Sequence, residues 1–502
     1  MTAPQVEVVQ LENGFRALLA PRRSLPVVAS VLWYRTGSRD ERTGETGLSH
    51  FLEHMMFKGT QRYAKGSIDM LTAKMGGNNN AFTDNDGTAY YFALASDRWE
   101  TALEIEASRM RDCLLDPQEF ASEKNVVLEE LAMGDDDPWR PLYQAAEGLL
   151  YQVHPYHHPV IGYRQDLEQL GVDGMRAYYD RHYGPNRAFL VVAGDIDVER
   201  TATRIRELFG ALPQSAEPRR EVLAEPQQQG ERRATLNTPH AVARLCIAFP
   251  TTRTGERDDY ALDVLAHDLG IGKNSRLYKR LVVEDESVTD VSVINETRLD
   301  PGAMFVLAEL RDGASLQKVE AAIREEIDAL VRTGVAKADL ARIRAQIRAG
   351  FLFQDESVLD HALKLARFEA LTPGGYRTLE TVLPTYASLK PEELKQVAAR
   401  YLLSSRSVCV HAVPGRVEVA ATQAKKKVKP AKAKRTTKPT KQAKVVKIAK
   451  LPKPSKLTKR IRSETLAKPV MKPKPPAKQK HADTQKGAKQ KNTGAAKRRT
   501  SK

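Results

Sequence analysis

The most informative segment of the sequence runs from residue 47 to residue 59 and reads GLSHFLEHMMFKG. Its apolar residues recur at the spacing of an α-helix, and the glycine at its end supplies a stop signal. His50 and His54 lie four positions apart, so in a helix they share one face and are separated by one turn. The segment therefore predicts a short helix that presents two imidazoles together.

Two imidazoles at this spacing suit a zinc ion, which binds histidine nitrogens at about 2.0–2.1 Å. Glu53 lies on nearly the same face, where its carboxylate reaches a water at the metal without being a ligand. A catalytic zinc keeps one position open for water and lowers its pKa to about 7, and a nearby carboxylate takes up the proton and returns it to the leaving amine. His50 and His54 are thus candidate ligands, and Glu53 is the candidate general base.

The third ligand is expected on a second helix, which begins at Asp116. An aspartate at the N-cap, proline at the first helical position and glutamate at the third form a clear start signal. Glu123 and Glu130 are seven residues apart on this helix, so they lie within roughly 20° of each other at the edge of its buried stripe. Paired half-buried carboxylates repel each other, and a dication offsets that cost. We take Glu130 as the third ligand and Glu123 as a carboxylate that orients a ligand or the water.

These features closely resemble the inverted zinc-binding metallopeptidases of the insulinase/pitrilysin family, and in particular its bacterial members that are similar to the mitochondrial processing peptidases. The family's H-x-x-E-H motif corresponds to HFLEH, and Glu130 follows 76 residues after His54. The resemblance covers roughly residues 5–415. It includes three further segments: GGNNNAFTDNDGTAYYFAL (76–94), HPYHHPVIG (154–162) and YGPNRAFLVVAGDID (183–197).

The resemblance implies one zinc ion per chain, bound by His50, His54 and Glu130, with Glu53 as general base. Glu123 matches an additional family glutamate. Asn80 and Ala81 match edge-strand residues that pair with the substrate backbone, and Phe57 matches a residue beside the substrate side-chain pocket. The implied fold class is α+β, with two similar α/β domains, each a mostly antiparallel sheet covered by helices. Two such units close into a clamshell around a chamber that admits peptides and unfolded chains.

The second half of the chain departs from the family pattern. Active members carry an arginine and a tyrosine, seven residues apart, shortly after an SRL-like motif, and these side chains stabilise the developing oxyanion. This chain has NSRL at 274–277, but Val282 and Thr289 stand at the two matching positions. Some family members divide the zinc site and the Arg/Tyr pair between two chains. We therefore expect this chain to be the zinc-bearing half of a heterodimer, with a homodimer as the alternative.

The order of strand-like and helical segments repeats along the chain. Apolar strand-like runs open and close each half, at 15–19, 27–34 and 188–193 in the first and at 241–249 and 407–413 in the second. Long helical patterns fill the middle of each half, at 103–133 and 316–353. We expect a zinc-bearing domain over 1–212, a Pro/Gln-rich linker over 213–232, a second domain without the metal motif over 233–420, and a disordered basic tail over 421–502.

Charge is divided unevenly between the body and the tail. The chain of 502 residues has a net charge of +16, yet residues 421–502 hold 29 of its 79 Lys and Arg residues against two acids. The remaining 420 residues hold 50 basic and 61 acidic residues, so the body is acidic. Such a tail binds polyanions through salt-sensitive contacts, and nucleic acid, acidic lipid headgroups and an acidic partner all remain open. With no aromatic residue, the tail has no platform for stacking bases.

The sequence also restricts compartment and class. Its three cysteines are scattered and cannot form a disulfide framework, and no apolar run is long enough to span a membrane. Because no signal peptide is evident, we expect a cytoplasmic protein, or a periplasmic one if the true start lies upstream. The predicted function is a zinc metalloendopeptidase that hydrolyses peptides or unfolded segments. The alternative is a noncatalytic assembly subunit, or a polyanion- or nucleic-acid-associated protein with a vestigial peptidase body.

Overall fold

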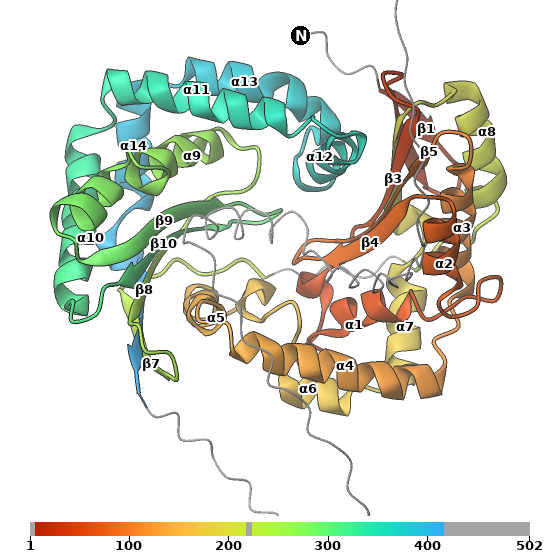
Figure 1. The fold of residues 1–502 in the computed structure, drawn as a ribbon, viewed down its shortest axis with the longest axis horizontal. Coiled ribbons are helices and arrows are strands. Elements are labelled where there is room, and N and C mark those ends of the chain that lie inside the picture. Colours follow the sequence, from red (N-terminus) through yellow and green to blue (C-terminus); the bar gives the residue numbers. More distant parts are fainter. Residues whose placement is uncertain (1–5, 217–222, 416–502) are drawn as a thin grey trace, which may run out of the picture. The chain divides into compact units, whose positions relative to one another are not determined.

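The computed structural model describes residues 6–216 and 223–415. They form two mixed sheets covered by helices (Figure 1), which agrees with the predicted α+β class. The predicted basic tail, residues 421–502, lies outside the described residues. None of the helices within the described ranges is long and apolar enough to cross a bilayer.

The first sheet has six strands in the order β1-β2-β6-β3-β5-β4. All neighbouring strands are antiparallel except β2 and β6, which are parallel. The central strands are buried on both faces, which explains why β3 and β6 read as continuous apolar runs rather than as an alternating pattern. The strand bounds are β1 (Glu7–Gln10), β2 (Arg16–Pro21), β3 (Val27–Tyr34), β4 (Asn78–Thr83), β5 (Thr88–Ala95) and β6 (Ala188–Gly194).

The second sheet repeats this topology with five strands in the order β7-β11-β8-β10-β9. Its parallel pair, β7 and β11, corresponds to β2 and β6, and its edge strand β9 corresponds to β4. The repeated order of elements predicted from the sequence is therefore present as a repeated sheet topology. The strand bounds are β7 (Arg232–Thr238), β8 (Arg244–Pro250), β9 (Val288–Glu296), β10 (Ala303–Leu310) and β11 (Val408–Pro414).

Each of the two long helical patterns of the sequence is broken into two helices. The first break lies between Asp112 and Pro117, where Leu115 has a φ of +46° and Asp116 caps the next helix. The second break falls at Gly334, whose φ of +73° ends its helix. The helices are α1 (Leu48–Met55), α2 (Ser67–Lys74), α3 (Glu100–Asp112), α4 (Pro117–Asp135), α5 (Arg140–Leu150), α6 (Arg164–Gln169), α7 (Val172–His182), α8 (Val198–Phe209), α9 (Arg257–Gly270), α10 (Leu316–Thr333), α11 (Lys337–Phe353), α12 (Val358–Leu371), α13 (Leu379–Ser388) and α14 (Pro391–Tyr401).

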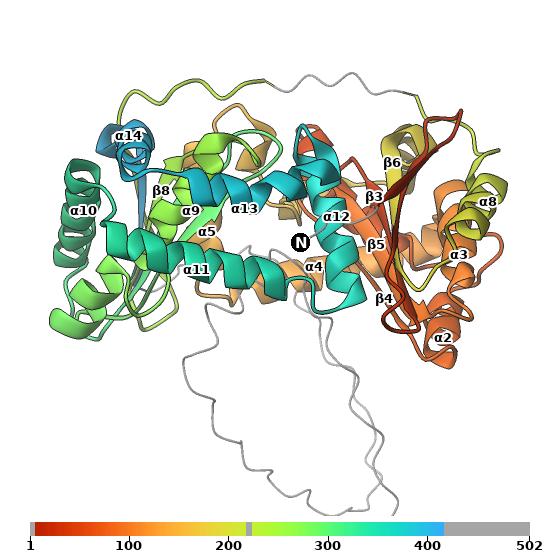
Figure 2. The same ribbon diagram turned by 90° about the horizontal axis from the view of Figure 1, so that it is seen from above.

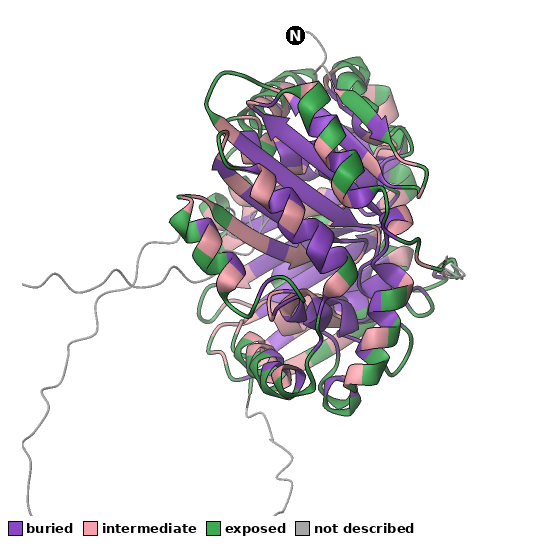
Figure 3. Cartoon of the chain, turned by 90° about the vertical axis from the view of Figure 1, so that its right-hand side faces the viewer, coloured by how far each residue is buried: buried purple, intermediate pink, exposed green. Residues whose placement is uncertain are grey.

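The two halves of the chain exchange one helix each. α5, from the first half, packs on β8 and β11 of the second sheet, and α12, from the second half, packs on β3 and β6 of the first sheet (Figure 2). Through α12, one face of the first sheet is covered by residues more than 160 positions further along the chain, and its central strands β3 and β6 are almost wholly buried (Figure 3). The exchange therefore buries apolar surface of each half against the other.

Candidate functional site

Helix α1 forms where the sequence predicts it, and its N-terminus is anchored by a buried carboxylate. Glu41 accepts hydrogen bonds from the backbone N–H groups of Gly47, at 2.8 Å, and Ser49, at 2.7 Å. Gly47 has a φ of +88°, and a Cβ atom there would lie 2.4 Å from the carbonyl oxygen of Ile161. Only glycine fits this close approach. The start of the helix, three residues before His50, is thus fixed by both capping and packing.

Helix α4 lies against α1 (Figure 1) and is capped as the sequence predicts. The Asp116 carboxylate accepts hydrogen bonds from the backbone N–H groups of the second and third helical residues, at 2.9 and 3.0 Å. Phe120 stacks on Phe51 of α1 with ring centroids 4.7 Å apart, and Val127 is fully buried. This packing turns the edge of α4 that carries Glu123 and Glu130 toward the two histidines.

Three donor atoms of the types that zinc prefers converge between these helices. The Glu130 Oε2 atom lies 3.8 Å from His50 Nε2 and 3.6 Å from His54 Nε2, and the three ligand atoms all lie within 4.8 Å of one another. Ligand atoms around a tetrahedral zinc are separated by about 3.4 Å, so a small contraction brings these atoms to ligand distance. Two imidazoles and one carboxylate fit a zinc ion that keeps an open fourth position.

The hydrogen bonding of His54 favours the tautomer that a metal needs. Its Nδ1 atom lies 2.9 Å from the Glu123 Oε1 atom, and because a carboxylate only accepts, Nδ1 carries the proton. The Nε2 lone pair therefore remains available on the side of Glu130. Burial lowers the pKa of His54, but the hydrogen bond to Glu123 and the charges of Glu53 and Glu130 outweigh it, so the pKa is raised. The site is rich in negative charge and favours a cation.

Lys58 holds the second oxygen of Glu123. Its Nζ atom lies 2.5 Å from Glu123 Oε2, so this carboxylate bridges an ammonium group and an imidazole. Burial raises the pKa of Glu123, but its hydrogen bonds from His54 and Lys58 outweigh that effect and the pKa is lowered. Glu123 is thus held as a carboxylate that can orient His54. Lys58 was not among the site residues predicted from the sequence, although its position four residues after His54 places it on the same helical face.

Glu53 is half-buried on the same face of α1 and contacts the edge strand of the first sheet. The Thr83 hydroxyl donates a hydrogen bond of 2.6 Å to Glu53 Oε2. Thr83 is the last residue of β4, 30 positions from Glu53. This contact was not predicted from the sequence, because nothing in the local sequence pattern around α1 indicates which strand this helix contacts.

The predicted substrate-binding residues border the metal-ligand cluster on two elements. Asn80 and Ala81 lie in β4, which pairs only with β5 among the described strands and so leaves one edge open. The Asp84 N–H group donates a hydrogen bond to the Gly87 carbonyl oxygen at the end of the β4–β5 hairpin. Hydrogen-bonded and non-hydrogen-bonded residue pairs alternate along the two strands from there, so Ala81 is at a non-hydrogen-bonded position. The backbone N–H and C=O groups of Ala81 therefore point toward the open edge. Phe57 follows α1, half-buried, with its ring beneath the Arg109 guanidinium at 4.5 Å.

The two second-half positions that depart from the family pattern carry no oxyanion donor of the expected kind. Val282 lies in the helical segment Tyr278–Glu284 and packs against the hydrophobic core of the second half of the chain. Thr289 lies in β9, and its hydroxyl donates a hydrogen bond of 3.0 Å to the Glu309 carboxylate. Neither side chain supplies the guanidinium or phenol that the resemblance implies at these places.

Comparison with known proteins places these features in a family. The sequence profile described as "Insulinase (Peptidase family M16)" matches residues 17–162, and that described as "Peptidase M16 inactive domain" matches residues 169–347. The zinc protease PqqE of Helicobacter pylori is 26% identical over 416 residues, which cover 82% of this chain and 93% of the relative. The uncharacterized zinc protease Rv2782c of Mycobacterium tuberculosis is 30% identical over 409 residues, which cover 78% of this chain and 92% of the relative.

Solved structures agree with the sequence relatives. A protease from Helicobacter pylori superposes with a TM-score of 0.78 at 26% identity and covers 82% of this chain and 100% of its own. The M16 inactive domain from Pseudomonas fluorescens shares the fold at 17% identity, with a TM-score of 0.74 over 82% of this chain and 99% of its own. With two M16 profiles matched and relatives aligned over most of their length, the chain belongs to the insulinase family of peptidases, family M16.

Proposed function

We propose that this chain is a zinc-dependent endopeptidase that hydrolyses peptides or unfolded polypeptide segments. The observation that carries the proposal is the convergence of His50, His54 and Glu130 beside Glu53, from two helices that the sequence fixes independently. Relatives over most of the chain are named zinc proteases, which supports zinc as the metal. A family clamshell chamber would restrict substrates to flexible segments.

Each residue of the proposed site has a separate task. His50, His54 and Glu130 would hold a zinc ion, which when bound polarises the scissile carbonyl and acidifies water. Glu53 takes a proton from the attacking water and delivers it to the leaving nitrogen. Glu123 keeps His54 in its Nδ1–H tautomer. The substrate adds as a strand at the open edge of β4, at Asn80 and Ala81, with one side chain beside Phe57.

Replacing Glu53 tests this proposal directly. Glu53→Gln removes the general base and leaves the three ligands intact, so we expect bound zinc to stay at one per chain. Hydrolysis of an unstructured peptide library, followed by mass spectrometry, should fall about 10²- to 10⁴-fold. The matched control is Glu45→Gln, a partly exposed glutamate in the loop before α1.

The second candidate is a noncatalytic assembly subunit with a vestigial peptidase body. Val282 and Thr289 favour it, because the chain by itself lacks the Arg/Tyr pair that active members use. This candidate would be supported against the peptidase if the wild-type protein binds zinc but gives the same products at the same rates as Glu53→Gln under every condition.

We propose a separate polyanion-binding role for the basic tail, residues 421–502. Its 29 Lys and Arg residues against two acids suit sequence-independent binding to phosphates of nucleic acid or to another polyanion. The full chain should bind a DNA duplex with an affinity that falls steeply as salt rises, and a chain ending at residue 420 should not. Affinity that does not change with salt would contradict this role.

A further inference from the structure

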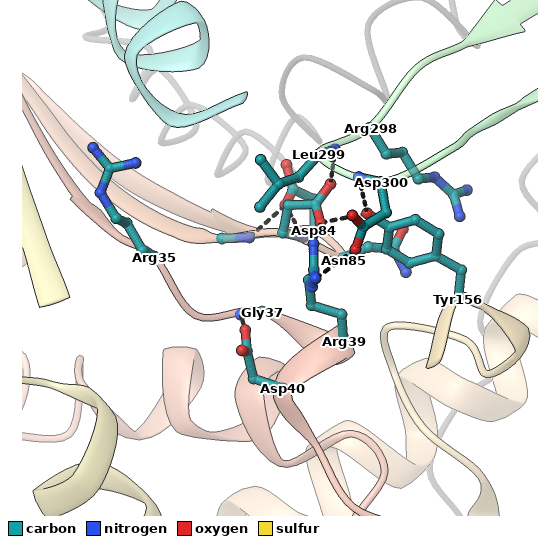
Figure 4. A network of polar contacts seen from close by, with 12 residues as sticks. Arg35, Gly37, Arg39, Asp40, Asp84, Asn85, Tyr156, Arg298, Leu299 and Asp300 are labelled. Atoms are coloured by element: carbon teal, nitrogen blue, oxygen red, sulfur yellow. Dashed lines mark hydrogen bonds and ion pairs between the residues drawn. The ribbon is translucent and has the colours of Figure 1, made fainter. Parts of the chain in front are cut away.

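The turn that follows β4 is held by both halves of the chain (Figure 4). The Asp86 carboxylate in this turn is buried and accepts three hydrogen bonds. Arg39 donates at 3.1 Å, the Tyr156 hydroxyl at 2.6 Å, and the backbone N–H of Leu299 at 3.0 Å. Arg39 and Tyr156 belong to the first half, whereas Leu299 lies between β9 and β10 of the second. One carboxylate thus joins the two halves.

Asp300 closes the same network from the second half. Its Oδ2 atom lies 2.6 Å from the Arg39 guanidinium, and its backbone N–H donates to the Tyr156 hydroxyl at 3.1 Å. The side chains of Arg39 and Asp86 are 3% and 4% exposed, and that of Asp300 is 16% exposed. Burying this ion pair in a low-dielectric region is costly unless every partner stays in place. The geometry of this connection between the two halves, the Asp86 joint, is therefore tightly held.

The turn itself has little freedom to move. The Asp84 carboxylate accepts hydrogen bonds from the backbone N–H groups of Asp86, at 2.8 Å, and Gly87, at 2.7 Å. The carbonyl oxygens of Asp84 and Asn85 accept from the backbone of the segment that carries Arg39. A Cβ atom at Gly87 would lie 2.2 Å from the Trp33 indole nitrogen. Any displacement of Asp86 therefore moves the end of β4.

Thr83, at that end of β4, is three residues from Asp86 and contacts the proposed general base. Its hydroxyl lies 2.6 Å from Glu53 Oε2 and 3.4 Å from the Thr88 hydroxyl. A glutamate side chain has several rotamers, and a short hydrogen bond from a fixed strand favours one of them. The position of Thr83 therefore helps to set where the Glu53 carboxylate points.

We propose that Thr83 is a positioning residue for Glu53, and that the Asp86 network, completed by Leu299 and Asp300 of the second half, holds Thr83 in place. This inference rests on the proposed peptidase function. It also assigns a task in the reaction to the second half of the chain, which holds β4 in place and so helps to orient Glu53. This task requires no arginine or tyrosine from the second half.

The first test separates positioning from folding. Thr83→Val removes the hydroxyl at nearly constant volume, and we expect kcat to fall about 10- to 100-fold with KM and bound zinc unchanged. Thr83→Ser restores the hydroxyl and should retain most of the wild-type kcat. Thr381→Val, at an exposed helical threonine, is the matched control. A Thr83→Val enzyme with wild-type kcat would overturn the role of Thr83.

The second test asks whether the joint acts through Thr83. Asp300→Asn should lower kcat in the wild-type background and have little further effect in Thr83→Val, because both changes release the same carboxylate. Asp312→Asn, at an exposed aspartate, is the control. Additive losses would mean that Asp300 acts independently of Thr83 and would overturn the coupling.

A third measurement does not depend on activity. Amide hydrogen exchange of the metal-loaded full chain should become faster over residues 78–88 in Asp300→Asn, while exchange in α8, remote in the sequence, stays unchanged. If wild type hydrolyses no peptide, the proposed function fails, whereas this exchange still tests the joint. Unchanged exchange over residues 78–88 would overturn the joint even if the peptidase is active.

Discussion

The protonation of individual side chains decides whether the site can hold a metal. His54 can offer its Nε2 lone pair because Glu123 accepts the proton on Nδ1, and Glu123 remains a carboxylate because Lys58 lies 2.5 Å away. Ammonium, carboxylate and imidazole thus form a chain that ends at the metal-ligand cluster. Outer partners of this kind commonly change metal affinity without touching the metal.

Replacing Lys58 tests this chain. Lys58→Met keeps the length of the side chain but removes the charge that holds Glu123, so we expect zinc affinity to fall about 10- to 100-fold in competition with a chelator. Lys65→Met is the matched control, because Lys65 pairs with Glu119, which lies on α4 as Glu123 does, and the Lys65 side chain is more exposed than that of Lys58. Equal zinc affinity in both variants would show that Lys58 does not influence the zinc ligand His54 through Glu123.

Among the elements, helix α10 is attached to the second sheet by one carboxylate. Glu320 accepts from both Arg233 of β7 and Arg324 of its own helix, and His411 of β11 lies 2.8 Å away. Glu320 and His411, together with Cys409, also have the spacing of a metal cluster. The two guanidinium groups already neutralise Glu320, and burial raises the pKa of the Cys409 thiol to about 12, so these groups are better suited to holding the helix.

The stability of this attachment should depend on pH. Burial raises the pKa of Glu320, but its hydrogen bonds from Arg233, Arg324 and His411 outweigh that effect and lower the pKa from 4.5 to about 2. Because the folded state holds the charged form, the stabilisation is present above pH 4.5 and is lost as pH falls toward 2. It amounts to at most about 3 kcal/mol, because solvent screens part of the charge.

Urea unfolding at several pH values checks this expectation. Glu320→Gln should lower the free energy of unfolding at pH 7 and flatten its decline between pH 4.5 and 2. Glu325→Gln, on the exposed side of the same helix, should leave both unchanged. A wild-type decline that persists in Glu320→Gln would assign the acid sensitivity to other carboxylates.

For the whole molecule, the exchange of α5 and α12 makes the two halves depend on each other. α5 follows α4, which carries Glu130, and packs on the second sheet, while α12 covers a face of the first. The second half therefore contacts the site's scaffold through α5 and through the Asp86 joint. At the two positions where the family pattern implies an arginine and a tyrosine that stabilise the oxyanion, the second half carries Val282 and Thr289.

A homologous chain with arginine and tyrosine at those positions should complete the enzyme. We expect the purified chain alone to hydrolyse unstructured peptides about 10²- to 10³-fold more slowly than an equimolar mixture with such a partner. Sedimentation of the mixture should show a heterodimer, whereas a pairing of identical chains with full activity would identify a homodimer. Full activity from a monomeric chain would contradict the division of roles.

Local patterns in the amino-acid sequence are enough to predict the short-range features of this protein. The spacing of His50 and His54 predicts a helix, and Asp116-Pro117 predicts where α4 begins; the structure confirms both elements. The repeated order of apolar runs predicts two similar sheets, because burial on two faces leaves continuous apolar strands. The helix and its cap depend on residues within one or two turns of each other, and each apolar run is itself a short stretch of sequence.

Which helices and strands contact one another depends on the tertiary packing. The periodicity of the two long helical patterns does not reveal where each one breaks, although the Asp116 N-cap marks the end of the first break; the second break falls at Gly334, whose φ is positive. The contact of Thr83 with Glu53, the Asp86 joint and the exchanged helices connect residues 30 to more than 300 positions apart. Such contacts are selected by the packing of whole layers, which no local pattern of the sequence encodes.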